Sequence, residues 1–187
     1  MTVPLARPLA LCFHLALETV QVDPETLVGM AAIQHHRGPD GFGVRRMPGV
    51  GFAHARLSIV DLNEQRARQP FESSDGKLML TQNGELYDYQ RIRADLTARG
   101  ARFRTKSDSE LILHLFPRTG LAGMLPYLRG EFAFALYDRD DETLYLVRDR
   151  FGIEDPALCV SCGICVGSCD GVAVTLGVAG PVLLWEN

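Results

Sequence analysis

Cys12 is a candidate nucleophile, and it is the only cysteine that precedes residue 159 in this sequence. A cysteine side chain attacks carbonyl carbons readily once a neighbouring base has taken up the thiol proton. The alternative is a structural one, because a lone cysteine on an apolar strand also serves as a small buried hydrophobic residue. Which role applies depends on the polar residues that the fold gathers around Cys12.

Four polar segments lie between residues 36 and 110, and each has an ordinary structural explanation when taken alone. Gly, Pro and Asp favour a turn in the first, the second is typical of a half-buried strand, Asn-Gly in the third is a common hairpin turn, and the fourth resembles a helix cap. The segments are HRGPDG (36–41), ARLSIVDL (55–62), NGELYDY (83–89) and SDSE (107–110). Their order along the chain carries more information than any one of them.

Taken together and in this order, the segments resemble the glutamine-hydrolysing domain of the asparagine synthetase family, a class II glutamine amidotransferase. That family has an N-terminal Cys-Gly-Ile followed by motifs that match His36–Gly41, Arg56–Leu62, Asn83–Tyr87, Ser107–Glu110, Gly130–Asp138 and Arg148–Gly152 here. The resemblance covers residues 12–153. It implies an α+β fold of the N-terminal-nucleophile hydrolase type, a four-layer αββα sandwich with two antiparallel sheets.

The resemblance also implies which residues hold glutamine, and the chemistry of each residue type agrees. The Arg56 guanidinium suits the α-carboxylate, and Asp108 with Glu85 suits the α-ammonium group. The Asn83 side chain and the Gly84 backbone N–H would stabilise the oxyanion, and we expect glycine at 84 because a side chain would keep the backbone away from the substrate. Ile59 and Val60 complete the expected substrate-binding set.

Cys12 matches the family nucleophile, which is the first residue of the mature protein and uses its own α-amine as the base. An α-amine titrates near neutral pH, at about 7.7 to 8.0, whereas an amide nitrogen bonded to Leu11 cannot accept the proton. Three explanations for residues 1–11 remain open: a propeptide that is removed, a misassigned start at Leu11 read as an initiator, and an inactive site. Phe13 also departs from the family, which has glycine there, and it would crowd the thiol.

A second group of cysteines lies in the segment 154–187, which contains no lysine or arginine. Cys159, Cys162, Cys165 and Cys169 have the C-x2-C-x2-C-x3-C spacing of a bacterial ferredoxin half-motif, with Asp170 where proline is usual. This spacing favours a single [4Fe-4S] cluster over tetrahedral zinc. The alternative is an unrelated tail attached by a frame change or gene fusion. We place the domain boundary near Glu154.

Composition narrows the class of protein further. The chain has 187 residues, a net charge of −4 and 47% hydrophobic residues, which is typical of one globular domain with a proper core. Scattered arginines and an acidic balance argue against nucleic-acid binding, and no apolar run is long enough for a membrane span. Crowded cysteines do not resemble a secreted disulfide framework, so we expect a cytoplasmic protein.

The secondary structure expected around these motifs mixes strands and helices. We predict strands at 12–22, 49–55, 56–62 and 77–83, and a hairpin over 131–152 with Phe132, Phe134 and Leu136 on one face. A helix should begin after Asp23 with Pro24 in its first turn, and its buried face should carry Leu27, Met30, Ala31 and either Ile33 or Gln34. Further helices are expected over 88–100, ending at Gly100, and over 107–118, capped by Ser107 or Asp108 with Glu110 in capping-box range.

The sequence therefore predicts hydrolysis of L-glutamine to glutamate and ammonia, without any cofactor for that step. ATP would enter only through a synthetase domain absent from this sequence, which would accept the ammonia. Two other functions remain open: a glutamine-binding pseudoenzyme that acts as a sensor, and an electron carrier built on the tail cluster.

Overall fold

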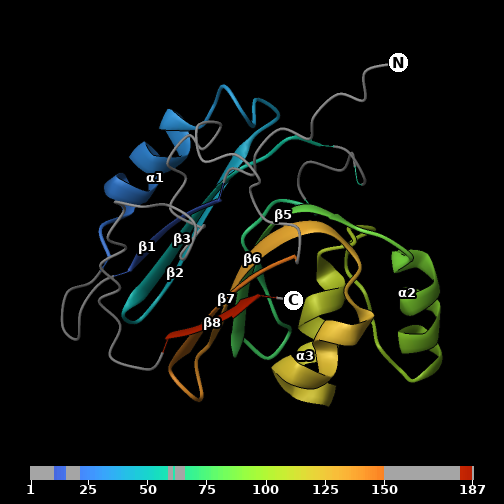
Figure 1. Cartoon of the computed structure of the whole chain (residues 1–187). Helices are drawn as coiled ribbons and strands as arrows, with labels where there is room; N and C mark the ends of the chain where they lie inside the picture. Colours follow the sequence, from blue (N-terminus) through green and yellow to red (C-terminus); the bar gives the residue numbers. More distant parts are fainter. Residues whose placement is uncertain (1–10, 16–21, 59–60, 62–65, 150–181, 187) are drawn as a thin grey trace.

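The chain folds into two β-sheets and three α-helices in the computed structural model, which describes residues 11–15, 22–58, 61, 66–149 and 182–186 (Figure 1). The first sheet has the order β1–β3–β2, with β1 Leu11–Leu15, β2 Phe42–Met47 and β3 Val50–Ala55, all antiparallel. The second has the order β4–β5–β6–β7–β8, with β4 Phe71–Glu72, β5 Leu78–Leu86, β6 Gly130–Asp138, β7 Thr143–Arg148 and β8 Val182–Glu186. Its strands are antiparallel except for the parallel pair β7–β8.

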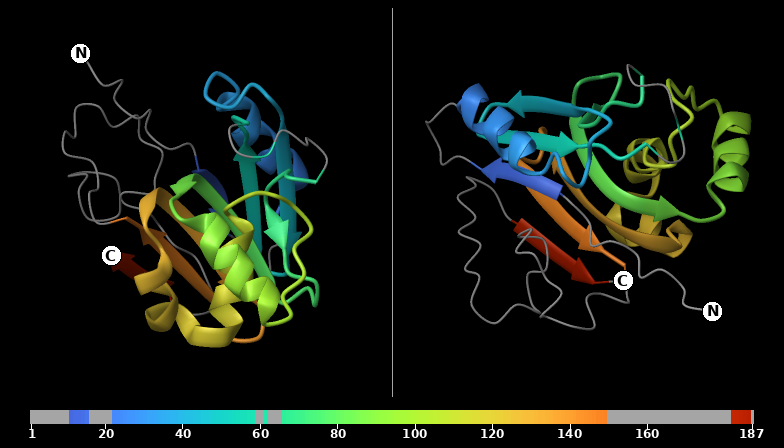
Figure 2. Two further views of the ribbon diagram at one scale, coloured as in Figure 1. Left: turned by 90° about the vertical axis from the view of Figure 1, so that its right-hand side faces the viewer. Right: turned by 90° about the horizontal axis from the view of Figure 1, so that it is seen from above.

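Helices cover the outer faces of both sheets, so the layers run helix, sheet, sheet, helix (Figures 1 and 2). Helix α1 (Pro24–Ile33) packs on the first sheet, and α2 (Tyr89–Ala98) and α3 (Glu110–Met124) lie on the second. A short 3₁₀ turn, Leu125–Tyr127, leads from α3 into β6. The predicted α+β fold with a four-layer αββα arrangement is confirmed.

Strand alternation in β6 separates two of the hydrophobic cores. Phe132, Phe134 and Leu136 pack against α2 and α3, whereas Ala133, Ala135 and Tyr137 face Val50 and Phe52 of the first sheet; these residues belong to two distinct buried clusters. Successive side chains of a strand point to opposite faces, so one strand serves both layers. The predicted shared face of Phe132, Phe134 and Leu136 is confirmed.

The predicted helix starts and stops are partly confirmed. Asp23 caps α1 by accepting hydrogen bonds from the backbone N–H groups of Glu25 and Thr26, and Gly100, with φ +88°, follows the end of α2. Ile33 is 78% exposed, so its placement on the buried face was wrong, while Leu27 and Ala31 are buried. The cause is that α1 ends at Ile33, where the chain leaves the sheet.

The predicted cap of α3 was wrong. Its N-cap residue is Ser109, and neither Ser107 nor Asp108 caps the helix with its side chain. Glu110 accepts hydrogen bonds from the backbone N–H groups of Arg104 and Thr105 instead of closing a capping box. The helix also continues past Pro117 to Met124, with a non-helical break at Gly120.

Among the predicted strands, 49–55 and 77–83 and the 131–152 hairpin correspond to β3, β5 and the pair β6–β7. Only Leu11–Leu15 forms a strand in the described part of the first one. The segment 56–62 is not a strand where it is described; Arg56 makes one isolated bridge with Pro39. Strands β2 and β4 were not predicted, and the boundary near Glu154 lies outside the described residues.

Candidate active site

Arg56 leaves the end of β3 and is held by the turn 36–41. Its backbone N–H donates to the Gly41 carbonyl at 2.8 Å, and its own carbonyl accepts from the Asp40 N–H at 3.1 Å. A Cβ at Gly38 would lie 2.4 Å from the Ala55 carbonyl carbon, so the turn approaches the strand as closely as only glycine permits. The HRGPDG turn therefore fixes the backbone from which Arg56 projects.

The Arg56 guanidinium is buried, with one part of its fork satisfied and another not. Nη2 donates to the Asp61 carbonyl, whereas Nη1 is buried and has no hydrogen-bond partner among the described residues. A buried guanidinium nitrogen without an acceptor is costly, and a carboxylate in its place would accept both donors of the fork. Arg56 is thus arranged to receive an anionic group.

Asn83, Gly84 and Glu85 all lie within β5, so the alternative of a hairpin turn at Asn-Gly was wrong. Asn83 pairs with Ala133 and Gly84 with Phe132 of β6. Gly84 has φ +100°, and a Cβ there would lie 1.9 Å from the Glu131 carbonyl oxygen. The constraint on Gly84 that the fold imposes is thus close approach to β6. Asn83 is half-buried and Glu85 is exposed.

Asp108 is buried beside the end of β5. Its Oδ2 accepts from the Leu86 N–H at 2.7 Å, and the Ser107 hydroxyl lies 3.4 Å from Oδ1. Burial raises the pKa of this carboxyl above its ordinary value, against the lowering effect of the N–H donors of Leu86 and Ser109. Because the hydrogen bonds do not fully offset burial, a cation beside Asp108 would stabilise its charged form.

Asp61 joins the segment after Arg56 to the segment before Asp108. Its carbonyl accepts from the Arg56 guanidinium, and its Oδ2 accepts from the Lys106 N–H at 2.8 Å. Residues separated by more than forty positions thereby meet at the end of β5. We call the described residues Arg56, Asp61, Asn83, Gly84, Glu85 and Asp108 the polar cluster.

Cys12 lies in β1, where it pairs with Ala53 of β3, three residues before Arg56. Strand β1 also comes close to β5, the strand that carries Asn83 and Gly84. The fold thus brings the backbone of the predicted nucleophile to the strands of the polar cluster. Ile59, Val60 and the cysteines Cys159, Cys162, Cys165 and Cys169 lie outside the described residues.

His54 is a buried polar residue that the sequence reasoning missed. It lies on β3 between Leu11 of β1 and Gly43 of β2, and its Nδ1 lies 3.0 Å from the Thr81 hydroxyl of β5, so it bridges the two sheets. Burial, and secondarily the nearby Arg56, lowers the pKa of His54 from 6.5 to about 4. Its signal in the sequence was its strand position, since Val50, Phe52 and His54 alternate along β3 and Val50 and Phe52 belong to the core between the sheets.

Comparison with known proteins agrees with this arrangement. Residues 11–161 match the glutamine amidotransferase domain family. The chain is 41% identical over 128 residues to asparagine synthetase [glutamine-hydrolyzing] 2 of Bacillus subtilis, covering 68% of this chain and 16% of the relative. It is 37% identical over 141 residues to asparagine synthetase B of Escherichia coli, covering 75% of this chain and 24% of the relative.

Other matches extend the range of related proteins. Amidase chry2 of Gibberella zeae is 43% identical over 121 residues, or 64% of this chain and 18% of that protein. Among solved structures, glutamine phosphoribosylpyrophosphate amidotransferase from B. subtilis aligns with 49% of this chain and 21% of its own at 27% identity, with a TM-score of only 0.40. The chain therefore spans less than a quarter of the length of each of these relatives.

The lowered pKa of His54 predicts a specific loss of stability in acid. The folded protein holds this ring neutral down to about pH 4, whereas the unfolded chain takes up a proton near pH 6.5. Its contribution to stability is present above pH 6.5 and is lost as the pH falls toward 4, by about 3 kcal/mol. Urea unfolding at several pH values should show this loss, and His54→Asn should flatten the curve in this window.

His36 provides the matched control because it is an exposed histidine. His36→Asn should keep the acid loss of the unchanged protein. An unchanged pH dependence in His54→Asn, despite a folded protein, would contradict the burial of a neutral His54.

Proposed function

Since the chain belongs to the glutamine amidotransferase domain family, with a match over residues 11–161, we propose that it hydrolyses glutamine to glutamate and ammonia. The observation that carries this proposal is the polar cluster. It places a buried guanidinium with an unpaired nitrogen and a buried carboxylate at the end of β5, joined through Asp61. Those two charges complement the α-carboxylate and α-ammonium group of a free amino acid.

The proposed reaction proceeds by acyl transfer to Cys12. The Cys12 sulfur bonds to the side-chain amide carbon of glutamine, and the oxygen of the tetrahedral intermediate accepts hydrogen bonds from the Asn83 side chain and the Gly84 N–H. The C–N bond then breaks, and the proton taken from the thiol passes to the departing ammonia. Water attacks the thioester, which releases glutamate and restores the thiol.

The base in this scheme is the α-amine of Cys12, so the active form must begin at that residue. In the sequence Leu11 precedes Cys12, and Leu11 pairs with His54 in β1. An amide nitrogen at this point would leave the thiol without its base. The same feature favours the second candidate, a protein that binds glutamine through Arg56 and Asp108 without hydrolysing it.

The ammonia would be consumed by an ATP-dependent synthetase domain. Two of the relatives described above are named as asparagine synthetases, and the chain spans 16% and 24% of their lengths. Asparagine synthesis on a separate or additional domain is therefore the expected fate of the product. A cytoplasmic location remains a prediction; none of the helices in the described residues is long and apolar enough to cross a membrane.

The iron–sulfur cluster is a separate proposal about the tail. Its four cysteines lie outside the described residues, and the family match ends at residue 161, before Cys162. Thiolates at Cys159, Cys162, Cys165 and Cys169 have the spacing that a [4Fe-4S] cluster requires, and they are its sole support.

The first prediction concerns Cys12. Glutaminase activity, measured as glutamate release, should appear only in protein whose intact mass shows Cys12 as the first residue. Cys12→Ala should abolish the activity while glutamine still raises the melting temperature, because Arg56 and Asp108 remain. Hydrolysis by protein that retains Met1 would overturn this mechanism, and binding without hydrolysis in protein starting at Cys12 would favour the sensor.

The second prediction separates binding from turnover. Arg56→Gln should weaken glutamine binding by about 1.5 to 3 kcal/mol, the value of a charge-assisted hydrogen-bonded pair. Asn83→Ala should instead lower kcat roughly a hundredfold or more, with little change in the dissociation constant. Arg99→Gln, on the exposed face of α2, is the control. Unchanged kinetics in both site variants would remove these residues from the site.

The third prediction concerns the tail. Protein prepared without oxygen should contain about four iron atoms with matching sulfide, and Cys169→Ser should lose them. Cys12→Ser is the control, because Cys12 belongs to the glutamine site and should not change the iron content. Iron-free protein after anaerobic reconstitution would end the cluster hypothesis and leave the glutaminase proposal intact.

A further inference from the structure

A cavity of about 740 Å³ lies between β2, the segment 66–70, β4 and the segment that precedes α3. None of the described residues of the polar cluster lines it. We propose that this cavity is a second binding site, which takes a phosphorylated small molecule with an apolar or planar body. Nothing in the glutamine chemistry requires such a site.

The wall formed by the segment 66–70 is fixed to the sheets on both sides. The Gln69 side chain donates to the Gln82 carbonyl at 2.9 Å and accepts from the Gln82 N–H at 2.6 Å. On the other side, a Cβ at Gly43 would lie 2.1 Å from the Gln69 carbonyl oxygen, so β2 and this segment are in close contact. Ala67 and Gln69 are buried, and Arg66 and Arg68 on alternate positions are exposed. Both arginines line the cavity.

The cavity is positively charged although the whole protein carries a net charge of −4. Its lining includes four arginines and two carboxylates; the arginines are Arg45, Arg66, Arg68 and Arg104. Within the described residues, Arg68 makes no ion pair. A cavity lined mainly by one sign of charge attracts ligands of the opposite sign.

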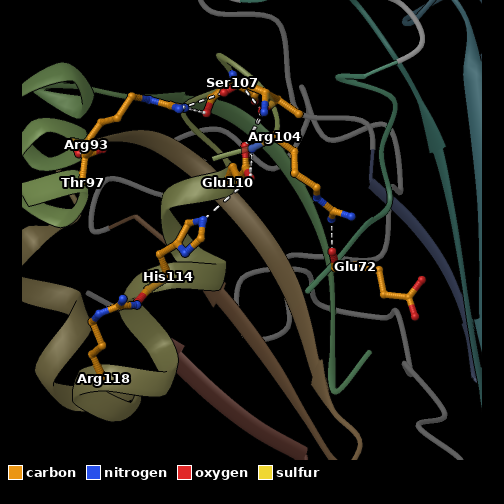
Figure 3. Close-up of polar contacts among 9 residues, drawn as sticks. Glu72, Arg93, Thr97, Arg104, Ser107, Glu110, His114 and Arg118 are labelled. Carbon is orange, nitrogen blue, oxygen red and sulfur yellow. Dashed lines mark hydrogen bonds and ion pairs between the residues drawn. The ribbon is translucent and has the colours of Figure 1, made fainter. Parts of the chain in front are cut away.

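The two carboxylates are already engaged. Glu110 accepts from the backbone N–H groups of Arg104 and Thr105 at 2.7 and 2.8 Å, and its Oε1 lies 3.7 Å from the His114 ring (Figure 3). The Glu72 carboxylate lies 3.9 Å from Arg45, and its carbonyl accepts from the Arg104 guanidinium (Figure 3). These contacts hold Arg104 at the cavity wall and leave the charge of the lining in excess of its carboxylates.

The size and the remaining lining indicate the kind of ligand. A volume of 740 Å³ is in the range of sites for organic ligands and exceeds what an inorganic ion needs. Phe42, Val44 and Pro70 supply an apolar wall, and Phe42 is 49% exposed. Guanidinium groups bind phosphate oxygens bidentately, so the lining fits a phosphate group attached to an apolar or planar body.

The test is a binding titration of the full chain with three probes: pyrophosphate, ADP and citrate. We expect ADP to bind more tightly than pyrophosphate because its ring contacts the apolar wall, and citrate to bind at least tenfold more weakly than pyrophosphate. The double variant Arg66→Gln/Arg68→Gln should lose about tenfold or more in affinity for both phosphorylated probes. The control Arg91→Gln/Arg99→Gln removes the same charge from exposed positions on α2 and should bind like the unchanged protein.

A second measurement uses the unchanged protein and so does not depend on the folding of a variant. Modification of arginines by phenylglyoxal, mapped by mass spectrometry, should be slowed by ADP at Arg66 and Arg68 and unaffected at Arg99. Failure of both phosphorylated probes to bind at millimolar concentration overturns the site. Equal weakening in the two double variants shows charge attraction alone and also overturns it, and citrate that binds as tightly as pyrophosphate rejects the phosphate assignment. The glutaminase proposal is unaffected by any of these results, because no residue of the polar cluster is changed.

Discussion

Strand β5 pairs with β6 along nine positions, from Leu78 opposite Asp138 to Leu86 opposite Gly130, and most functional side chains are positioned by contacts with β5. His54 reaches it through Thr81, Gln69 through Gln82, and Asp108 through Leu86. Each of these partners is buried, where an unmade hydrogen bond would cost about 1 to 3 kcal/mol. The register of β5 against β6 therefore fixes where the turns and loops of the site can lie.

That register depends on Gly84. With φ +100° and only 1.9 Å between a hypothetical Cβ and the Glu131 carbonyl oxygen, no other residue keeps the two strands at this distance. The same residue is the expected donor of an oxyanion hydrogen bond from its backbone N–H. A structural requirement and a proposed catalytic one thus fall on one position, and a substitution of Gly84 would not separate them.

Burial gives the charged groups around β5 different tendencies. His54 is kept neutral by burial, which lowers its pKa to about 4, and burial raises the pKa of Asp108. Arg56 stays a cation in the same region with one nitrogen unpaired among the described residues. A neutral histidine between the sheets adds no competing positive charge beside Arg56, so the attraction for an anionic substrate group comes from Arg56 itself.

Local signals in the sequence determined the elements that depend on neighbouring residues. Asp23 and Pro24 started α1, Gly100 followed α2, and the alternation of Phe132, Phe134 and Leu136 gave a strand with one face on the helices. These features follow from caps, turns and the period of two, which act within a few residues. The order of the polar motifs, through their resemblance to a family, also gave the fold class, which the four layers confirm.

Only the tertiary structure decided what depends on distant partners. Asn-Gly at 83–84 has the local preference of a hairpin turn, yet nine residues of pairing with β6 keep it inside a strand. Asp108 has the local pattern of a helix cap, and the Leu86 N–H takes its carboxylate instead. The segment after Ala55 reads as a strand, but its described residues serve the turn 36–41 and Asp61. The sequence by itself determined which residues have the chemistry for glutamine; long-range pairing determined which of them meet, because a hydrogen bond between residues far apart in the chain leaves no local pattern to detect.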